Sequence, residues 1–162
     1  MSLEKFMKKD FVIVPATTSL ADVAKVKLDR HVGDVIIAKT KNGKAEVQEG
    51  VIGIVTDRDL VLEFAKKGQL DPKRKAGEFI KGKVTVASVD EGLGAAIQKM
   101  NKNGVRRVPV VNVNKKVVGI LCADDCMEIL GVEMNTLAGI VKNALKKEKS
   151  SRHATPARVK AL

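Results

Sequence analysis

The stretch Gly53-Ile54-Val55-Thr56-Asp57-Arg58-Asp59-Leu60 has the pattern of a buried strand that ends at a threonine and turns directly into a helix. A second stretch, Gly119-Ile120-Leu121-Cys122-Ala123-Asp124-Asp125, repeats this pattern less closely, with a cysteine in place of the threonine. Each turn carries a carboxylate three residues further on, at Asp59 and at Asp125. The sequence therefore predicts two places that hold a small polar ligand.

The rest of the chain is also duplicated. Leu20–Ala24 aligns with Leu93–Ile97 at an offset of 73 residues (93 − 20), and at the two turns the offset falls to 66 (119 − 53). The first half therefore carries about seven extra residues, which we place in a polar hairpin at residues 39–50 because this segment is rich in Lys, Asn and Gly. Such a repeat constrains the fold before any single element is considered.

Each half predicts the element order β-α-β-β-α behind a short lead-in. In the first half these elements are the lead-in Leu3–Lys8, the strand Phe11–Val14, a helix capped near Thr18 or Ser19 with apolar positions Leu20, Val23, Ala24 and Leu28, the strands Asp34–Ala38 and Val51–Val55, and the helix Asp57–Lys67. In the second half they are the lead-in Lys75–Ile80, the strand Val84–Ala87, a helix capped near Asp90 with apolar positions Leu93, Ala96, Ile97 and Met100, the strands Val108–Val113 and Val117–Leu121, and the helix Ala123–Leu130. Glycines that end helices are expected at Gly68 and Gly131.

Neither half can cover its own sheet, so we expect an α/β fold in which the two halves pack face to face as a pseudo-twofold pair. The predicted boundaries are residues 1–71 for the first repeat and 72–131 for the second. Residues 132–162 are expected to form a C-terminal helix, from Glu133 to about Lys147, and a disordered basic tail from Ser150 onward.

The composition favours a cytoplasmic protein. Of the 162 residues 44% are hydrophobic and only 2% aromatic, so the core must consist of Val, Ile, Leu and Ala. No apolar run approaches the roughly 20 residues of a membrane span, and the N-terminus lacks the apolar segment of a signal peptide. Cys122 and Cys126 lie one helical turn apart, where we expect neither a disulfide nor a metal site.

The positive charge is concentrated at the C-terminus. The net charge is +11, and residues 142–160 alone hold seven Lys or Arg and one Glu, which gives +6. A basic tail indicates an anionic partner, and nucleic acid bound through phosphate contacts is the alternative function that we keep open. The near absence of aromatic residues argues against base stacking, so this role is expected to be an accessory one.

The turn at Thr56 has two interpretations that its sequence leaves open. A helix N-terminus with a free hydroxyl can receive a phosphate, and the Asp59 carboxylate one turn on can accept two hydrogen bonds from the hydroxyls of a ribose. Thr-x-x-Asp is also close to a capping box, in which both side chains only satisfy their own backbone. The duplication of the turn favours a binding role, because both copies keep the aspartate.

At these motifs the chain resembles a tandem pair of CBS domains, the regulatory module of the cystathionine-β-synthase type. The resemblance covers residues 4–131 and lies in the two turn motifs, in Phe6-Met7, Val32-Gly33 and Gly104-Val105, and in Arg106-Arg107-Val108-Pro109-Val110. It implies that an adenosine compound (AMP, ADP, ATP or S-adenosylmethionine) binds between the halves as a regulatory ligand, with no other cofactor.

The resemblance also implies roles for individual residues. It places Asp59 on the ribose together with Thr56, and Asp125 likewise, although Cys122 departs from the usual Ser or Thr and a thiol is a weak donor. It implies phosphate contacts for the residues before the strand, Arg106 and Arg107, whereas the equivalent Gly33 and Asp34 make the two clefts chemically unequal. The residues expected to flank the adenine or line the cleft are Ile13, Val14, Val86, Ala87 and Pro109.

No catalytic constellation is evident in the sequence. It contains no Ser/His/Asp set, no Cys/His cluster and no phosphate-binding lysine loop, and His31 is expected at a helix end on the surface. We therefore expect a protein that is not an enzyme. The resemblance further implies a homodimer formed through the two-helix faces and a regulated partner that is a separate protein.

Overall fold

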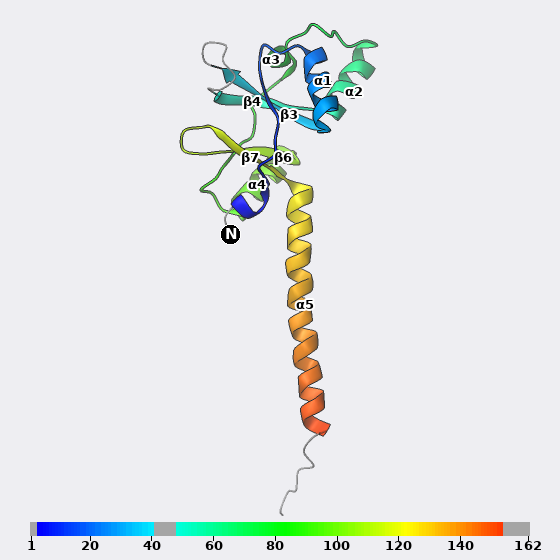
Figure 1. Ribbon diagram of the computed structural model, residues 1–162, viewed down its shortest axis with the longest axis vertical. Coiled ribbons are helices and arrows are strands. Elements are labelled where there is room, and N and C mark those ends of the chain that lie inside the picture. Colours follow the sequence, from blue (N-terminus) through cyan, green and yellow to red (C-terminus); the bar gives the residue numbers. More distant parts are fainter. Residues whose placement is uncertain (1–2, 41–47, 154–162) are drawn as a thin grey trace, which may run out of the picture. The chain divides into compact units, whose positions relative to one another are not determined.

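The computed structural model describes residues 3–40 and 48–153, which form two compact units, Met1–Asp125 and Cys126–Leu162 (Figure 1). The first unit contains the sheets of both repeats, and the second contains most of one long helix. Residues 41–47 of the expected hairpin and the tail 154–162 lie outside the described residues. The domain boundaries drawn from the sequence stay a prediction.

The first repeat forms a three-stranded sheet. Its strands β2 (Ile13–Pro15), β3 (Asp34–Thr40) and β4 (Gln48–Thr56) lie in the order β2-β3-β4, with β2 parallel and β4 antiparallel to β3. The helix α1 (Leu20–Arg30) connects β2 to β3, and α2 (Asp57–Lys67) follows β4 without a loop. Figure 1 shows α1 and α2 next to each other at one end of this sheet.

The second repeat has the same arrangement, and its sheet also includes the strand β1 from the start of the first repeat. Its sheet has the order β1-β7-β6-β5, from β1 (Met7–Lys8), β7 (Val117–Cys122), β6 (Arg107–Val111) and β5 (Ala87–Ser88). The helix α4 (Leu93–Asn103) connects β5 to β6. The expected order β-α-β-β-α is thus confirmed in both halves. The strands β2 and β5 begin later than expected, since Phe11, Val12 and residues 84–86 lie outside them.

The two lead-in segments each cross to the opposite repeat. The first consists of the 3-10 helix η1 (Leu3–Lys5) and β1, and Met7 of β1 pairs with Leu121 of β7. The second contains α3 (Ala76–Phe79) and continues to Ile80, which packs on β4 of the first repeat. This exchange ties the halves together and explains why the duplicated sequence forms one compact unit.

The glycine that opens each turn motif makes room for this crossing. A Cβ atom on Gly53 would lie 2.6 Å from Cγ2 of Ile80, and one on Gly119 would lie 2.7 Å from Sδ of Met7. A side chain at either position would therefore displace the lead-in from the sheet. The sequence shows both glycines in equivalent places but not the segments that they accommodate.

The helix ends agree with the sequence at most positions. Ser19 caps α1 by accepting a hydrogen bond from the Asp22 backbone N–H, and α2 ends at Gly68 with a φ of 71°, both as expected. The expected cap at Asp90 is wrong, because α4 begins behind Gly92 and has no side-chain cap.

The expected helix end at Gly131 is also wrong. A single helix, α5, runs from Ala123 to His153 through this glycine. Residues 133–147 are helical as expected but continue the preceding helix, and residues 150–153, expected in the disordered tail, are helical as well. Good helix formers stand on both sides of Gly131, and an interior glycine costs a helix only about 1 kcal/mol relative to alanine.

The core of the first repeat contains Val14, Leu20, Val23, Val35 and Val55, all buried between α1 and the sheet. The apolar stripe expected on α1 is half correct. Leu20 and Val23 are fully buried, but Ala24 is exposed and Leu28 is 72% exposed. Lys27 is buried in their place, with only 6% of its surface exposed, because its amine finds polar partners at the adjoining turn.

Candidate functional site

Thr56, Asp59, Arg106 and Arg107 line one cleft of about 980 Å³ in the first unit. Its walls come from the end of β4, the first turns of α2, the segment 79–85 ahead of β5 and the loop 103–107 ahead of β6. Both repeats therefore contribute to it, and the structure brings together four of the residues predicted from the sequence.

The charged side chains that line the cleft are mainly basic. Six of its lining residues are basic and three are acidic, and the acidic Glu63 is already paired with Lys67 and Arg74 at 2.7 Å each. The hydrogen bond from Lys67 in particular holds the pKa of Glu63 below its usual value, against the opposing effect of burial. The positive potential of such a surface favours an anionic ligand. The basic residues are Arg58, Lys66, Lys81, Lys83, Arg106 and Arg107.

The turn at Thr56 forms a complete capping box. Oδ2 of Asp59 accepts hydrogen bonds from the Thr56 backbone N–H at 2.9 Å and from the Thr56 hydroxyl at 2.6 Å, while Oγ1 of Thr56 accepts from the Asp59 N–H at 3.2 Å. The Asp57 N–H is also bonded, to Gly33 O at 3.2 Å. The backbone donors that a phosphate would use at this helix N-terminus are therefore largely occupied in this conformation.

The capping box leaves one oxygen of Asp59 available. Both cap bonds to its carboxylate end on Oδ2, and Oδ1 receives no hydrogen bond from any residue that the structure describes. Asp59 is only half-buried and lies on the cleft wall. Capping and ligand contact are thus compatible, because each can use a different oxygen of the same carboxylate.

The two arginines are both held by carboxylates. Arg107 forms an ion pair with Asp34, and these two residues occupy equivalent positions of the repeats (107 − 34 = 73). Asp34 stands opposite Thr56 in the first sheet and Arg107 opposite Cys122 in the second, so the pair joins the two turns. Arg106 donates to Asp124 at 2.6 Å, where both side chains are exposed. A phosphate at either arginine would have to share it with, or displace, its carboxylate.

The second turn differs from the first in its chemistry. Oδ1 of Asp125 is 2.9 Å from the amine of Lys8, and Oδ2 is buried without a hydrogen-bond partner among the described residues. Burial, and then the negative charge of Asp125, raise the pKa of the Cys122 thiol to about 11. Cys122 is therefore neutral at physiological pH and is a poor donor to a phosphate. The carboxylate of this turn is occupied by a lysine of the chain itself.

The remaining predicted site residues lie outside the Thr56 cleft. Val14, Ala87 and Pro109 are buried, while Ile13 and Val86 are half-buried on or next to the short strands β2 and β5. Their role beside an adenine stays a prediction. Lys81 and Lys83 line the cleft but were not predicted from the sequence, although the Lys-Gly-Lys run ahead of a strand is a visible signal of a basic turn.

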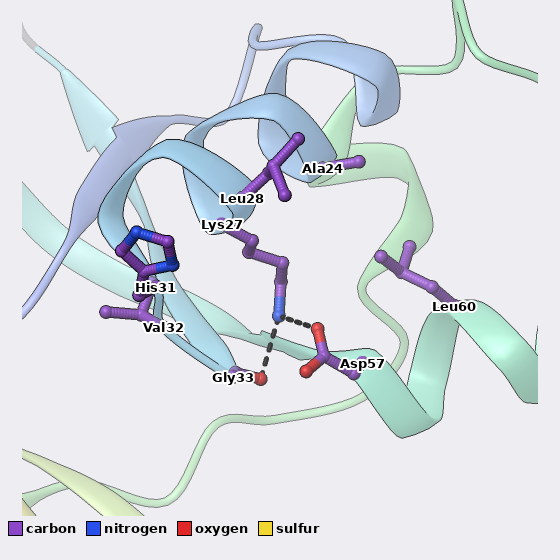
Figure 2. Close-up of a pocket in the computed structure, with 8 residues that line it drawn as sticks. All are labelled: Ala24, Lys27, Leu28, His31, Val32, Gly33, Asp57 and Leu60. Carbon is purple, nitrogen blue, oxygen red and sulfur yellow. Dashed lines mark hydrogen bonds and ion pairs between the residues drawn. The ribbon is translucent and has the colours of Figure 1, made fainter.

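A smaller hollow of about 500 Å³ adjoins this site and centres on Lys27 (Figure 2). The Lys27 amine donates to Gly33 O at 2.8 Å and to Oδ1 of Asp57 at 3.0 Å. Gly33 and Asp57 line both this hollow and the larger cleft. Lys27 therefore fixes the loop before β3 to the start of α2, and so supports the wall that carries Thr56.

Residues 3–40 and 48–153 contain no group of three or more His, Cys, Asp or Glu placed to hold a metal ion. Within the same residues, no helix has both the length and the hydropathy required to cross a membrane.

Comparison with known proteins identifies the repeats. The family model described as the CBS domain matches residues 3–66 and again residues 76–132. An uncharacterized protein of Methanopyrus kandleri is 25% identical over 129 residues, which are 80% of this chain and 62% of that protein. A homoserine O-acetyltransferase of Methanosalsum zhilinae is 26% identical over 132 residues, which are 81% of this chain but 24% of the enzyme. The chain thus spans less than two thirds of the length of either relative.

Solved structures share the fold at low sequence identity. A CBS domain protein of Pyrobaculum aerophilum complexed with AMP aligns with a TM-score of 0.64 at 24% identity, over 77% of this chain and 89% of that one. The CBS domain pair of protein MJ0100, in complex with 5′-methylthioadenosine and S-adenosyl-L-methionine, aligns with a TM-score of 0.65 at 22% identity, over 82% and 98%. These likenesses confirm the expected pair of α/β repeats.

Proposed function

The chain belongs to the CBS domain family, and we propose that its two repeats form a non-enzymatic sensor that binds an adenosine-containing nucleotide in the Thr56–Asp59 cleft. The observation that carries this proposal is the cleft itself, which combines a basic lining with an Asp59 oxygen that has no hydrogen-bond partner among the described residues. The AMP bound to the Pyrobaculum aerophilum protein and the adenosine compounds bound to MJ0100 support the ligand class.

In this proposal the Asp59 carboxylate divides its two oxygens between two tasks. Oδ2 keeps the capping box, and Oδ1 accepts a hydrogen bond from a ribose hydroxyl. The basic residues Lys81, Lys83 and Arg106 attract the phosphates, and the apolar surface of Ile52 and Ile80 receives the base. Charged hydrogen bonds of this kind contribute about 1.5–3 kcal/mol each.

The charge of the cleft favours AMP, ADP or ATP over S-adenosylmethionine. The latter carries a sulfonium and an ammonium group against one carboxylate, so its net charge is positive and a mainly basic lining opposes it. We further propose that one nucleotide binds per chain, because Lys8 already occupies Asp125 at the second turn.

A thermal-shift screen with AMP, ADP, ATP and S-adenosylmethionine tests the ligand class. A ligand that binds only the folded state raises the unfolding temperature in proportion to the logarithm of its concentration above Kd. We expect a rise with the three phosphorylated compounds and little or none with S-adenosylmethionine. The absence of a shift with all four compounds would refute the proposed function.

The sensor is proposed to act as a homodimer on a separate protein partner in the cytoplasm, where Cys122 and Cys126 stay reduced. The dimer contact is assigned to the face of α1 and α2, because Leu28, Val61 and Phe64 are 72%, 64% and 55% exposed there. Ligand binding changes the activity of the partner only if the two states of the sensor differ in affinity for the ligand.

A second candidate function is an accessory association with nucleic acid through residues 142–160. It is favoured by the exposed lysines at the end of α5, at positions 142, 146, 147 and 149. Replacing these four lysines with glutamine should abolish a mobility shift of DNA or RNA and its salt dependence, if this function exists. An unchanged shift would exclude this segment as its cause.

A further inference from the structure

The helix α5 exposes a long apolar stripe in the second unit. Met134, Leu137, Ile140, Val141 and Leu145 each expose between 53% and 66% of their surface. A contiguous set of exposed apolar side chains of this size marks an interaction surface in most monomeric proteins.

The spacing of this stripe is that of a helix that pairs with another helix. Its seam residues alternate in steps of four and three, which is the heptad spacing of positions a and d in a coiled coil. They are Met134, Leu137, Val141 and Ala144. This spacing is also that of an ordinary amphipathic helix, so it allows a helical partner, and the charges along α5 carry the choice.

The charges along α5 indicate which helix this partner is. Residues 126–141 contain Glu128 and Glu133 and no Lys or Arg, whereas residues 142–149 contain four Lys and one Glu. Two copies of the helix side by side in the same direction would place like charges together. Two copies in opposite directions place the acidic half of each against the basic half of the other.

We propose that α5 pairs with α5 of a second copy of this chain as an antiparallel coiled coil. In such a pair an a residue packs against a d residue of the other helix, and g residues flank g residues. Leu137 of each copy then packs against Val141 of the other, and Met134 packs against Ala144. In this same register Glu133 of each copy faces Lys147 of the other, twice in the dimer.

This register also accounts for the exposed residues beside the seam. Ile140 lies at a g position at the centre and meets Ile140 of the second copy, which covers two further apolar side chains. The e positions hold Gly131, Ala138 and Leu145, none of which is charged, so no repulsion arises on the other flank. The interface uses neither the α1–α2 face nor the nucleotide cleft, and its existence does not depend on the proposed function.

A charge exchange on the full chain tests the proposal. In a Phe64→Asp background, which disrupts the α1–α2 contact, sedimentation equilibrium should show a dimer, and adding Glu133→Lys should weaken its association roughly tenfold or more, because two like-charged contacts are created. Glu133→Lys combined with Lys147→Glu should restore the wild-type association. A double variant no stronger than the single one would overturn the antiparallel register.

Apolar substitutions distinguish this interface from others. Leu137→Asp should lower the dimer fraction, and Val113→Asp, at an 81% exposed loop residue of the first unit, should leave it unchanged. Circular dichroism of each variant verifies that the helix persists. An association that survives Leu137→Asp in the Phe64→Asp background would overturn the proposal, and so would a wild type that stays monomeric at all concentrations, or that associates only when DNA or RNA is added.

Discussion

Asp59 carries the functional account at the scale of single residues. The sequence shows the Thr-x-x-Asp pattern, and the structure adds that the capping box and a ligand contact can use different oxygens. No sequence rule assigns the two oxygens, because their separation depends on the rotamer of Asp59 and on the Thr56 hydroxyl. The same limit applies to Lys8, whose contact with Asp125 joins residues that are far apart in the sequence.

Two substitutions separate the two tasks of this turn. Thr56→Ala removes part of the cap and should lower the free energy of unfolding by about 0.5–2 kcal/mol. Asp59→Ala should lower it by a similar amount and should also weaken nucleotide binding by roughly ten- to a hundredfold, because one charged hydrogen bond is lost. Chemical denaturation and calorimetry measure the two effects.

Asp125→Ala is the matched control for the ligand contact. It removes the equivalent carboxylate of the second repeat, which is paired with Lys8, and should leave nucleotide affinity unchanged. Equal losses of affinity for Asp59→Ala and Asp125→Ala would contradict the assignment of a single cleft.

The raised pKa of Cys122 predicts that its thiol reacts slowly with alkylating agents and that the reaction rate depends strongly on pH. The folded environment favours the neutral form, so the thiolate fraction, and with it the rate of alkylation by iodoacetamide, should rise about tenfold per pH unit from pH 8 to above pH 10. Unfolded protein should instead level off near the ordinary pKa of 9.0. Peptide mapping by mass spectrometry at Cys122 measures the rate, and a plateau near pH 9 in the folded protein would contradict the burial of this thiol.

At the scale of elements, the repeat predicts the order of helices and strands but not how the segments cross. Periodicity identifies α1, α2, α4 and the central strands, since these patterns are local. The exchange of the lead-ins is not local, because β1 belongs to the first repeat in sequence and to the second sheet in space. The buried Lys27 was likewise missed, since a lysine in an apolar stripe predicts exposure unless its partners are known.

The contact between Gly53 and Ile80 predicts that a second substitution can recover the stability that Gly53→Ala loses. Gly53→Ala should reduce the free energy of unfolding by about 1–3 kcal/mol, because the new Cβ overlaps only side-chain atoms of Ile80. Ile80→Ala removes those atoms, so the double variant should be more stable than the sum of the two losses predicts. Denaturant titration of the four proteins measures this coupling.

Two other glycines serve as comparisons for this double-mutant experiment. A Cβ atom on Gly119 would also lie 2.9 Å from the backbone oxygen of Lys8, so Met7→Ala should rescue Gly119→Ala only in part. Gly94, in α4, has nothing within 4 Å of its built Cβ, and Gly94→Ala should not destabilise the protein. Additive losses for Gly53→Ala and Ile80→Ala would contradict the proposed contact.

At the scale of the whole molecule, each unit exposes apolar residues of its own, on α1 and α2 in the first unit and on α5 in the second. The sequence predicts the α/β repeat pair, the basic C-terminal segment and the resemblance that leads to the ligand class. It did not predict the continuous helix α5. A glycine such as Gly131 can end a helix or lie inside one, and the free energy of the whole segment decides between the two.

The α1–α2 face predicts a separate effect on assembly. Phe64→Asp places a charge on a 55% exposed apolar residue of α2 and should weaken the dimer contact of the first unit without changing nucleotide affinity. Combining it with Leu137→Asp separates the two surfaces in sedimentation experiments. Identical sedimentation of Phe64→Asp and the wild type would assign no contact to that face.

A crystal structure of the chain with bound ATP tests the central claim most directly. The account predicts electron density for one nucleotide in the cleft, with a ribose hydroxyl on Oδ1 of Asp59, the Thr56 cap intact on Oδ2 and the phosphates among Lys81, Lys83 and Arg106. A cleft that remains empty at saturating ATP, or a nucleotide held at Asp125 instead, would contradict it.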